Sequence, residues 1–180
     1  MKNRELIKPT LLDFAILGLI QSQPLSGYRI RKLFEETALG SYSSSPGTIY
    51  PALNRLQKFE LVKKSARSKA TKPCFEITTN GLQILREWFT KPVEKIEVEK
   101  KTAELLLRFG FMEALVGKEQ KINFLTSFHD LLSIYINELQ TYYNEESINM
   151  PLHGRLAFQY GIDSTKTTFK WCKKAISQIA

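Results

Sequence analysis

Residues 43–59 carry the clearest chemistry in the chain. If this stretch is a helix, Asn54 and Arg55 lie on its polar side, and these side chain types make paired hydrogen bonds to the edges of adenine and guanine. The start of such a helix also offers free backbone N–H groups, which suit a phosphate. Three hydroxyls add to that start: Ser44, Ser45 and Thr48. The stretch therefore predicts a DNA recognition helix, and an ordinary amphipathic surface helix is the alternative.

The same stretch contains the signals that would form and orient this helix. Ser45 can act as the N-cap, and Pro46 then stands at the first helical position, where a missing N–H has no cost. Ile49, Leu53 and Leu56 recur at helical spacing and make one apolar face. That face would pack on the rest of a domain and leave the polar side open to a partner.

Two short apolar runs follow the helix and flank a basic tip. Leu61–Lys64 and Cys74–Thr78 predict two strands, and the polar segment Ser65–Pro73 joins them, as in the β-hairpin wing of a winged helix. A basic loop of this kind can lie along a phosphate backbone, where it adds affinity but little sequence discrimination. The five basic residues between Leu61 and Pro73 are Lys63, Lys64, Arg67, Lys69 and Lys72. The alternative is a solvated charged loop.

Three further helices are predicted around these elements. Thr10 can cap an almost wholly apolar helix over Leu11–Ile20, and Ser26 can cap a second over Gly27–Glu36. With the polar turn before residue 46, the order of helices is that of a helix-turn-helix. A fourth helix is predicted over residues 82–89, after the second strand.

The positive charge is concentrated in the half of the chain that contains these elements. The chain of 180 residues has a formal net charge of +8, and residues 1–90 hold 14 Lys and Arg against 7 Asp and Glu. Residues 91–180 hold 12 against 11, so that half is close to neutral. This asymmetry predicts a polyanionic partner for the first half.

The second half has the pattern of three helices, over residues 98–116, 118–144 and 154–179. The middle helix carries apolar residues with alternating gaps of three and four, which is typical of a seam that packs helix against helix. We expect this half to dimerise, and an intramolecular three-helix bundle is the alternative. The expected interface residues are Leu125, Phe128, Leu132, Tyr135, Leu139 and Tyr142, with Phe169 and Ile176 from the last helix.

The residues offer little for catalysis, metal binding or membrane insertion. Only His129 and His153 are available as imidazole bases, and neither belongs to a metal-binding or phosphate-binding motif. Cys74 and Cys172 are too few for a disulfide framework, so they are interpreted as free thiols in a reducing cytoplasm. No apolar run reaches the length of a membrane span. We therefore predict a cytoplasmic protein that is not an enzyme and needs no metal or cofactor.

Residues 11–89 resemble the PadR family of winged-helix transcriptional regulators of bacteria and archaea. The Gly-Thr-Ile-Tyr-Pro block with Ser-Gly-Tyr ahead of it is the most specific part of the match. The matching segments are Leu17–Leu19, Pro24, Ser26–Tyr28, Gly47–Leu53, Arg55–Leu56, Leu61–Val62, Lys72–Pro73, Phe75–Thr78 and Gly81. Two features depart from the family: Glu60 stands where glycine is usual, and the wing tip lacks the usual Gly-Arg-Pro type of sequence.

The resemblance implies a homodimer that binds an inverted-repeat operator on double-stranded DNA and usually represses a nearby gene. It implies that the third helix enters the major groove while the wing follows the backbone. Family members also often respond to small aromatic or lipophilic compounds. By position, the DNA contacts implied are Tyr28, Ser44, Thr48 and Tyr50, with Pro51 and Arg55 in the family pattern and the wing lysines on phosphates. The residues considered for an effector pocket are Phe109, Phe111, Tyr135 and Trp171, whose alternative role is in the core.

These observations together predict a mainly α-helical protein. An N-terminal winged helix-turn-helix domain with a two-stranded wing would occupy residues 1–92, and a dimerisation domain of three helices would occupy residues 93–180. The expected function is that of a DNA-binding regulator, with a small-molecule effector as an option. The alternative is a winged helix used for protein contact without sequence-specific DNA binding.

Overall fold

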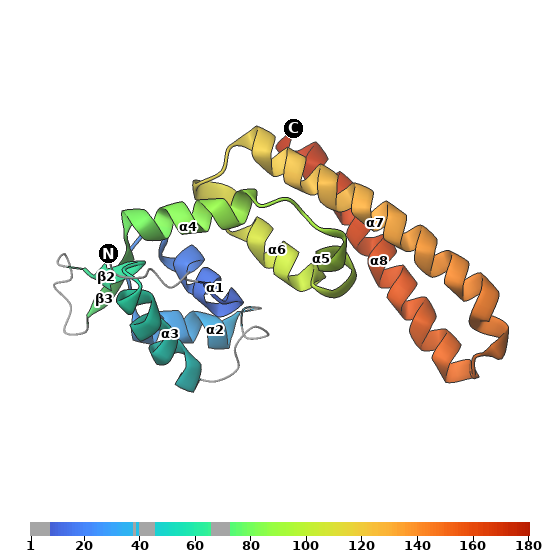
Figure 1. The fold of residues 1–180 in the computed structure, drawn as a ribbon, viewed down its shortest axis with the longest axis horizontal. Coiled ribbons are helices and arrows are strands. Elements are labelled where there is room, and N and C mark those ends of the chain that lie inside the picture. Colours follow the sequence, from blue (N-terminus) through green and yellow to red (C-terminus); the bar gives the residue numbers. More distant parts are fainter. Residues whose placement is uncertain (1–7, 38, 40–45, 66–72) are drawn as a thin grey trace, which may run out of the picture. The chain divides into compact units, whose positions relative to one another are not determined.

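The computed structural model describes residues 8–37, 39, 46–65 and 73–180 of the chain. It divides the chain into two compact units, residues 1–89 and 90–180. Helices account for most of both units, and one small antiparallel sheet lies in the first (Figure 1). The predicted fold class, a winged helix-turn-helix followed by helices, is confirmed.

The first unit is built from four helices: α1 (Leu11–Ile20), α2 (Gly27–Glu36), α3 (Pro46–Lys58) and α4 (Thr79–Thr90). The predicted caps of the first two helices are confirmed. The hydroxyl of Thr10 accepts from the N–H of Asp13, and the hydroxyl of Ser26 accepts from the N–H of Arg29. The core of the unit is apolar and nearly free of solvent. Its fully buried members include Ile16, Leu17, Ile20, Ile30, Phe34, Ile49, Leu53, Leu56, Leu61, Leu85 and Phe89.

The sheet has three strands rather than the predicted two. β2 (Val62–Lys64) and β3 (Cys74–Ile77) form the predicted hairpin. A short strand β1 (Leu25–Ser26) pairs with the other edge of β3, so the order is β1-β3-β2. Because Ser26 also caps α2, this third strand fixes the start of α2 against the base of the wing.

The turn between α3 and β2 is made by a non-glycine residue in a left-handed conformation. Glu60 has a φ of 57°, at the position where the family usually has glycine. The N–H of Leu61 donates to the carbonyl of Leu56 at 2.9 Å, and the N–H of Glu60 donates to the carbonyl of Gln57 at 2.9 Å. These two bonds are those of a Schellman motif, which ends a helix with a left-handed residue. The departure from glycine therefore keeps the turn but strains its backbone.

We expect Glu60→Gly to stabilise the first unit by about 1 kcal/mol, because glycine adopts the left-handed conformation without the Cβ penalty. The measurement is the free energy of unfolding in a denaturant titration. Glu60→Ala is the control, since it removes the same charge but keeps the Cβ atom. Equal stabilisation by both variants would assign the effect to charge and contradict the backbone account.

A close approach between α4 and the chain before β2 ties the wing to the helices. The N–H of Thr78 donates to the carbonyl of Leu61 at 3.0 Å, and the Thr78 hydroxyl donates to the carbonyl of Glu60 at 2.7 Å. The same hydroxyl accepts from the N–H of Gly81 at 3.0 Å and so caps α4. A Cβ atom at Gly81 would lie 2.2 Å from the carbonyl oxygen of Leu61. Only glycine fits at this junction.

The second unit contains four α-helices where three were predicted. They are α5 (Lys95–Lys100), α6 (Thr102–Gly110), α7 (Lys118–Glu146) and α8 (Leu152–Ile179), with short 3-10 turns after α6 and α7. The long α7 and α8 form an antiparallel hairpin (Figure 1). The predicted continuous helix over residues 98–116 is wrong. The chain turns at Lys101, whose ψ of 28° ends α5, and α5 then packs against both α6 and α7.

The guanidinium group of Arg108 is buried in the second unit. The Arg108 side chain is 2% exposed, and its Nη2 donates to the carbonyl of Lys91 at 2.7 Å. Its guanidinium carbon lies 4.6 Å from the centroid of the Phe124 ring, in a cation–π contact. Burial lowers the pKa of Arg108, while the charge of Glu97, whose Oε1 is 3.9 Å from Nη1, acts in the opposite direction. Arg108 thus joins α6, α7 and the start of the unit.

Candidate nucleic-acid interface

The third helix presents one buried face and one exposed face, as its sequence pattern predicts. It begins at Pro46, and Ile49, Leu53 and Leu56 are almost completely buried against α1, α2 and β2. The exposed side contains four of the five α3 residues predicted to contact DNA: Thr48, Tyr50, Pro51 and Asn54. Ser44 and Ser45, which were predicted as DNA contacts and as the N-cap, lie outside the described residues.

A groove of about 390 Å³ lies beside the exposed face of α3. It is formed where the start of α2, the middle of α3 and the base of the wing meet. Tyr28 and Tyr50 are 43% and 48% exposed, and their phenol rings both line this groove. The complete lining is Ser26, Gly27, Tyr28, Tyr50, Asn54, Gln57, Lys64, Pro73 and Phe75. The structure therefore brings four predicted contact residues from three elements to one surface, namely Tyr28, Tyr50, Asn54 and Lys64.

The position of Tyr50 depends on a glycine in the neighbouring helix. A Cβ atom at Gly27 would lie 2.8 Å from Cε1 of Tyr50 and 3.4 Å from Cδ1 of Leu53. Gly27 thus lets the start of α2 approach α3 closely enough for Tyr50 to lie along the groove. The groove also includes Gln57, which was not among the predicted contacts although it is one helical turn from Asn54.

The two described wing lysines differ in their charge environment. Lys63 and Glu76 are register partners across the hairpin, and Lys63 Nζ lies 3.1 Å from Glu76 Oε1. Lys64 faces Phe75 in the register and lines the groove. Within the described part of the chain, Lys64 has no carboxylate within 4 Å of its ammonium group. Arg67, Lys69 and Lys72 lie outside the described residues, so among the described basic residues of the wing Lys64 is the one placed beside α3 without a carboxylate partner.

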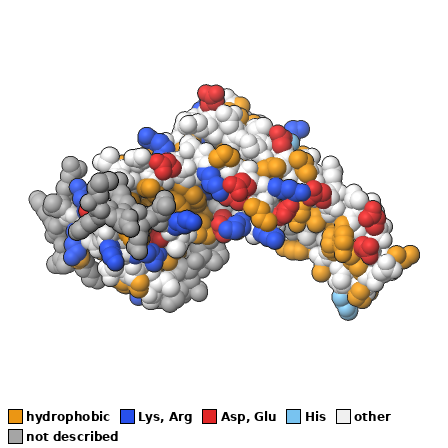
Figure 2. Space-filling view, in the orientation of Figure 1, with side chains coloured by type: hydrophobic (Ala, Val, Ile, Leu, Met, Phe, Trp, Pro, Cys, Tyr) orange, Lys and Arg blue, Asp and Glu red, His pale blue; other side chains and the backbone are white. Residues whose placement is uncertain are grey.

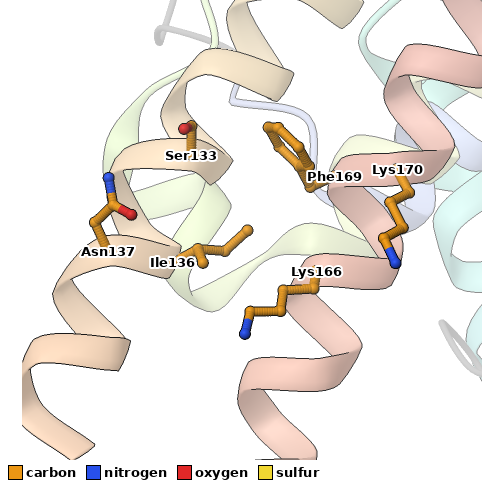
Figure 3. Close-up of a pocket in the computed structure, with 6 residues that line it drawn as sticks. All are labelled: Ser133, Ile136, Asn137, Lys166, Phe169 and Lys170. Carbon is orange, nitrogen blue, oxygen red and sulfur yellow. The ribbon is translucent and has the colours of Figure 1, made fainter. Parts of the chain in front are cut away.

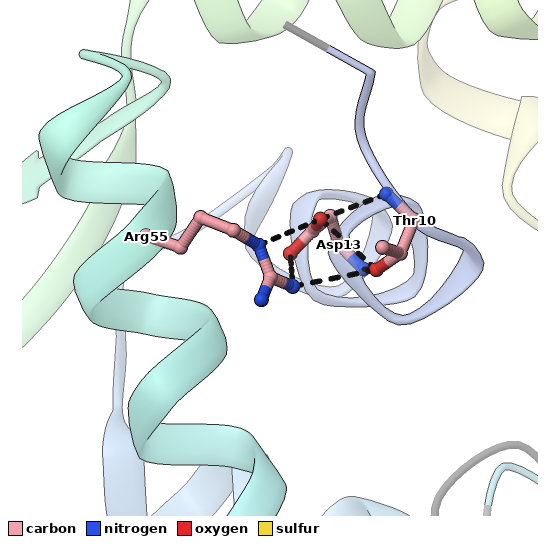
Figure 4. A network of polar contacts seen from close by, with 3 residues as sticks. All are labelled: Thr10, Asp13 and Arg55. Atoms are coloured by element: carbon pink, nitrogen blue, oxygen red, sulfur yellow. Dashed lines mark hydrogen bonds and ion pairs between the residues drawn. The ribbon is translucent and has the colours of Figure 1, made fainter.

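Arg55, which was predicted to contact DNA, is bound to another residue of its own domain in this structure. Its guanidinium binds Asp13, which is in the first turn of α1 (Figure 4), and Arg55 is not among the residues that line the groove. Nε donates to Asp13 Oδ2 at 3.2 Å, and Nη2 donates to Asp13 Oδ1 at 2.6 Å and to the Thr10 hydroxyl at 3.4 Å. The Asp13 side chain is only 2% exposed, and a carboxylate buried to this extent requires a cation and hydrogen bonds. Arg55 therefore holds α3 against α1 in this structure.

Sequence reasoning missed Asp13 as the partner, although two signals for it were present. Asp13 is the only charged residue within Leu11–Ile20, and it follows the Thr10 cap at the spacing of a capping box. Its Oδ2 accepts from the N–H and from the hydroxyl of Thr10, at 2.8 and 2.9 Å. A lone acid in an otherwise apolar helix requires a basic partner, and Arg55 meets that requirement.

The comparisons with known proteins agree with this architecture. Residues 16–87 match the model of the Transcriptional regulator PadR-like family. The N-terminal unit is a PadR-like domain. The chain is 30% identical over 112 residues to the negative transcriptional regulator PadR of Bacillus subtilis (strain 168). The matched region covers 61% of this chain and 60% of that protein. It is 34% identical over 86 residues to the transcriptional regulator YqjI of Escherichia coli (strain K12), covering 48% of this chain and 41% of that protein.

The chain thus spans less than two thirds of the length of either relative. Among solved structures, it is similar to Bacillus subtilis PadR in complex with operator DNA, with a TM-score of 0.42 and 23% identity over 95% of this chain and 100% of that chain. The matched family model and both relatives are named as transcriptional regulators, which agrees with the prediction that this chain is not an enzyme. None of the helices in the described part of the chain is both long and apolar enough to cross a membrane.

Beyond the PadR-like domain, the predicted dimer residues divide into two groups. Leu125, Phe128 and Leu132 are fully buried within the second unit itself, so for them the structure favours the intramolecular alternative. Phe169 stacks on His129 of α7, with a centroid distance of 4.1 Å. The remaining members are half-buried or exposed on α7 and α8: Tyr135, Leu139, Tyr142 and Ile176. The apolar seam of α7 packs largely within one chain, because α5, α6 and α8 cover the first half of this seam.

Three of the four aromatics considered for an effector pocket, Phe109, Trp171 and Tyr135, have defined contacts in this structure. Phe109 stacks on Phe124 at 6.2 Å and meets Trp171 edge-on at 5.6 Å, so both are part of a packed aromatic cluster. Tyr135 lies near Glu99 and Glu138 instead, and burial followed by these two charges raises its pKa. These contacts support the alternative role in the core for Phe109 and Trp171, and an effector pocket formed by the four residues stays a prediction.

Proposed function

We propose that this protein is a transcriptional repressor that binds an inverted-repeat operator as a homodimer and is released by a small-molecule effector. The observation that carries the DNA-binding part is the groove beside α3, where two phenols, an amide and an unneutralised ammonium come from three different elements of a PadR-like domain. Such groups suit phosphate oxygens and base edges rather than an apolar partner surface. The excess of basic residues in the same half of the chain adds long-range attraction for DNA.

The homodimer is supported by an apolar stripe on the second unit. Ile148, Leu152, Leu156 and Tyr160 recur every four residues and are 84%, 58%, 59% and 74% exposed. Hydrophobic side chains are visible on the surface of the α7–α8 hairpin towards its free end (Figure 2). Exposed apolar patches of this kind mark protein contacts. Two copies of the chain that pair through this stripe would be related by a twofold axis, which matches the symmetry of an inverted repeat.

The proposal is tested with the two described wing lysines, which form a matched pair. We expect Lys64→Ala to weaken binding to operator and to unrelated DNA alike, and to reduce the slope of log affinity against log salt by about 0.9, because one phosphate contact is lost. Lys63→Ala should change the slope much less, because Glu76 already neutralises Lys63 at 3.1 Å. Gel-shift titrations over a salt series measure both slopes on DNA upstream of the protein's own gene.

Two results would contradict the proposal. A wild-type protein that shifts no DNA fragment even at low salt would make the unit a protein-contact module, the alternative named from the sequence. A Lys64 variant that loses only sequence preference would assign Lys64 to base edges instead of phosphate. Sedimentation of the same samples tests the homodimer, since a monomer of 20.7 kDa at micromolar concentration would overturn that part.

A further inference from the structure

A second groove, of about 240 Å³, lies between the two long helices of the second unit. Ser133, Ile136 and Asn137 of α7 line one side, and Lys166, Phe169 and Lys170 of α8 line the other (Figure 3). Ile136 and Phe169 project into the space between the helices and give the groove an apolar floor. The two lysines come from successive turns of α8, and the lining includes none of Phe109, Phe111, Tyr135 and Trp171.

The charge of this groove is unbalanced. Lys166 Nζ donates to Oε1 of Gln140, a neutral amide, at 3.0 Å. Within the described residues, neither Lys166 nor Lys170 has a carboxylate within 4 Å of its ammonium group. The nearest acids along each helix are engaged elsewhere: Asp163 accepts from the Gln159 amide at 3.1 Å, and Glu138, next to Asn137, pairs with Lys95 at 2.5 Å. Helix-dipole stabilisation does not explain the two lysines, because it is confined to the last turn and α8 continues to Ile179.

We propose that this groove binds a small carboxylate that carries an apolar body. The carboxylate would accept from Lys166 and Lys170, and charge-assisted hydrogen bonds of this kind are the strong ones in proteins. The apolar body would cover Ile136 and Phe169, and the Ser133 hydroxyl and Asn137 amide can bind a polar substituent. The volume limits the ligand to a compact molecule. This assignment rests on the proposed function only in that the ligand would be the effector.

The site is tested by calorimetric titration of the full-length protein with benzoate and octanoate, and with benzyl alcohol and octanol as neutral counterparts. We expect at least one carboxylate to bind and its alcohol to bind about tenfold more weakly or worse, since the charged contacts are lost. The double variant Lys166→Met/Lys170→Met should lose carboxylate binding by about tenfold or more while keeping the alkyl stems. Lys173→Met on the same helix is the matched control and should bind as the wild type does. The tighter of the two carboxylates identifies the body as aromatic or aliphatic.

Absence of carboxylate binding at millimolar concentration would overturn the site, as would equal affinity for acid and alcohol or unchanged affinity in the double variant. Gel-shift titrations without carboxylate measure DNA binding independently. Failure of the ligand site can therefore be distinguished from failure of the proposed function. The double variant should bind operator as the wild type does, because its changes are outside the PadR-like domain. Lysine-dependent carboxylate binding by a protein that binds no DNA would keep the site and reject the repressor proposal.

Discussion

Gly81→Ala is expected to cost the PadR-like domain about 3 kcal/mol or more of unfolding free energy, which is a large part of the stability of a small domain. The added Cβ atom would lie 2.2 Å from the carbonyl oxygen of Leu61, and a backbone oxygen cannot move aside as a flexible side chain can. Relief requires moving α4 away from the turn before β2. That movement breaks the bonds of Thr78 to Glu60 and Leu61, which anchor the wing.

The two tryptophans allow this effect to be measured in one unit at a time. Trp88 stacks on Phe14 at 4.4 Å within the first unit, and Trp171 lies in the second. Denaturant titration of Gly81→Ala in a Trp171→Phe background therefore follows the PadR-like domain alone. Gly161→Ala in a Trp88→Phe background is the control, because its Cβ meets no atom within 4 Å and alanine favours a helix by about 0.5–1 kcal/mol. A Gly81 variant as stable as the wild type would refute the close approach.

Arg55→Met is expected to destabilise the PadR-like domain by about 3 kcal/mol, because it leaves the buried Asp13 carboxylate without a cation. The bonds from Thr10 to Asp13 remain, but the two bonds from the guanidinium are lost. Asp13→Asn should cost less, since the Arg55 side chain is 38% exposed and water can replace the missing partner. The double variant Asp13→Asn/Arg55→Met should recover part of the loss, because it buries no unpaired charge.

This cycle distinguishes a structural role from direct DNA contact. The structural role predicts a lower melting temperature in Arg55→Met in the absence of DNA, together with a coupling energy between the two positions. Unchanged thermal stability combined with a loss of operator discrimination would return Arg55 to the base contact expected from its place on the polar face of α3. Thermal unfolding and gel shifts on the same four proteins provide both measurements.

Local signals in the sequence were sufficient for most of the first unit. Thr10 and Ser26 are strong caps, Pro46 suits the start of α3, and the spacing of Ile49, Leu53 and Leu56 correctly predicts the buried face. The strand β1 was missed because two residues are too few to show an alternating pattern, and their pairing with β3 is made across a separation of about 50 residues in the chain.

The remaining differences come from contacts that periodicity does not encode. Nothing at Lys101 disfavours a helix, and the turn there is associated with the packing of α5 on α7. Helical spacing shows that Leu125, Phe128 and Leu132 are buried, but it does not show whether their partner is the same chain or a second copy. In the same way, the polar face of α3 was evident, while the use of Arg55 by Asp13 depends on two residues 42 positions apart.

The engagement of Arg55 also affects which bases α3 could read, if the proposed repressor binds as we expect. With the guanidinium held by α1, the exposed residues in the first and middle turns of α3 are uncharged, namely Thr48, Tyr50, Pro51 and Asn54, and the exposed Lys58 is in the last turn. Amide side chains pair best with adenine, and small apolar groups pack on the methyl of thymine. The repressor would then prefer operators with A·T pairs opposite the centre of α3, and the wing would bind the neighbouring phosphates.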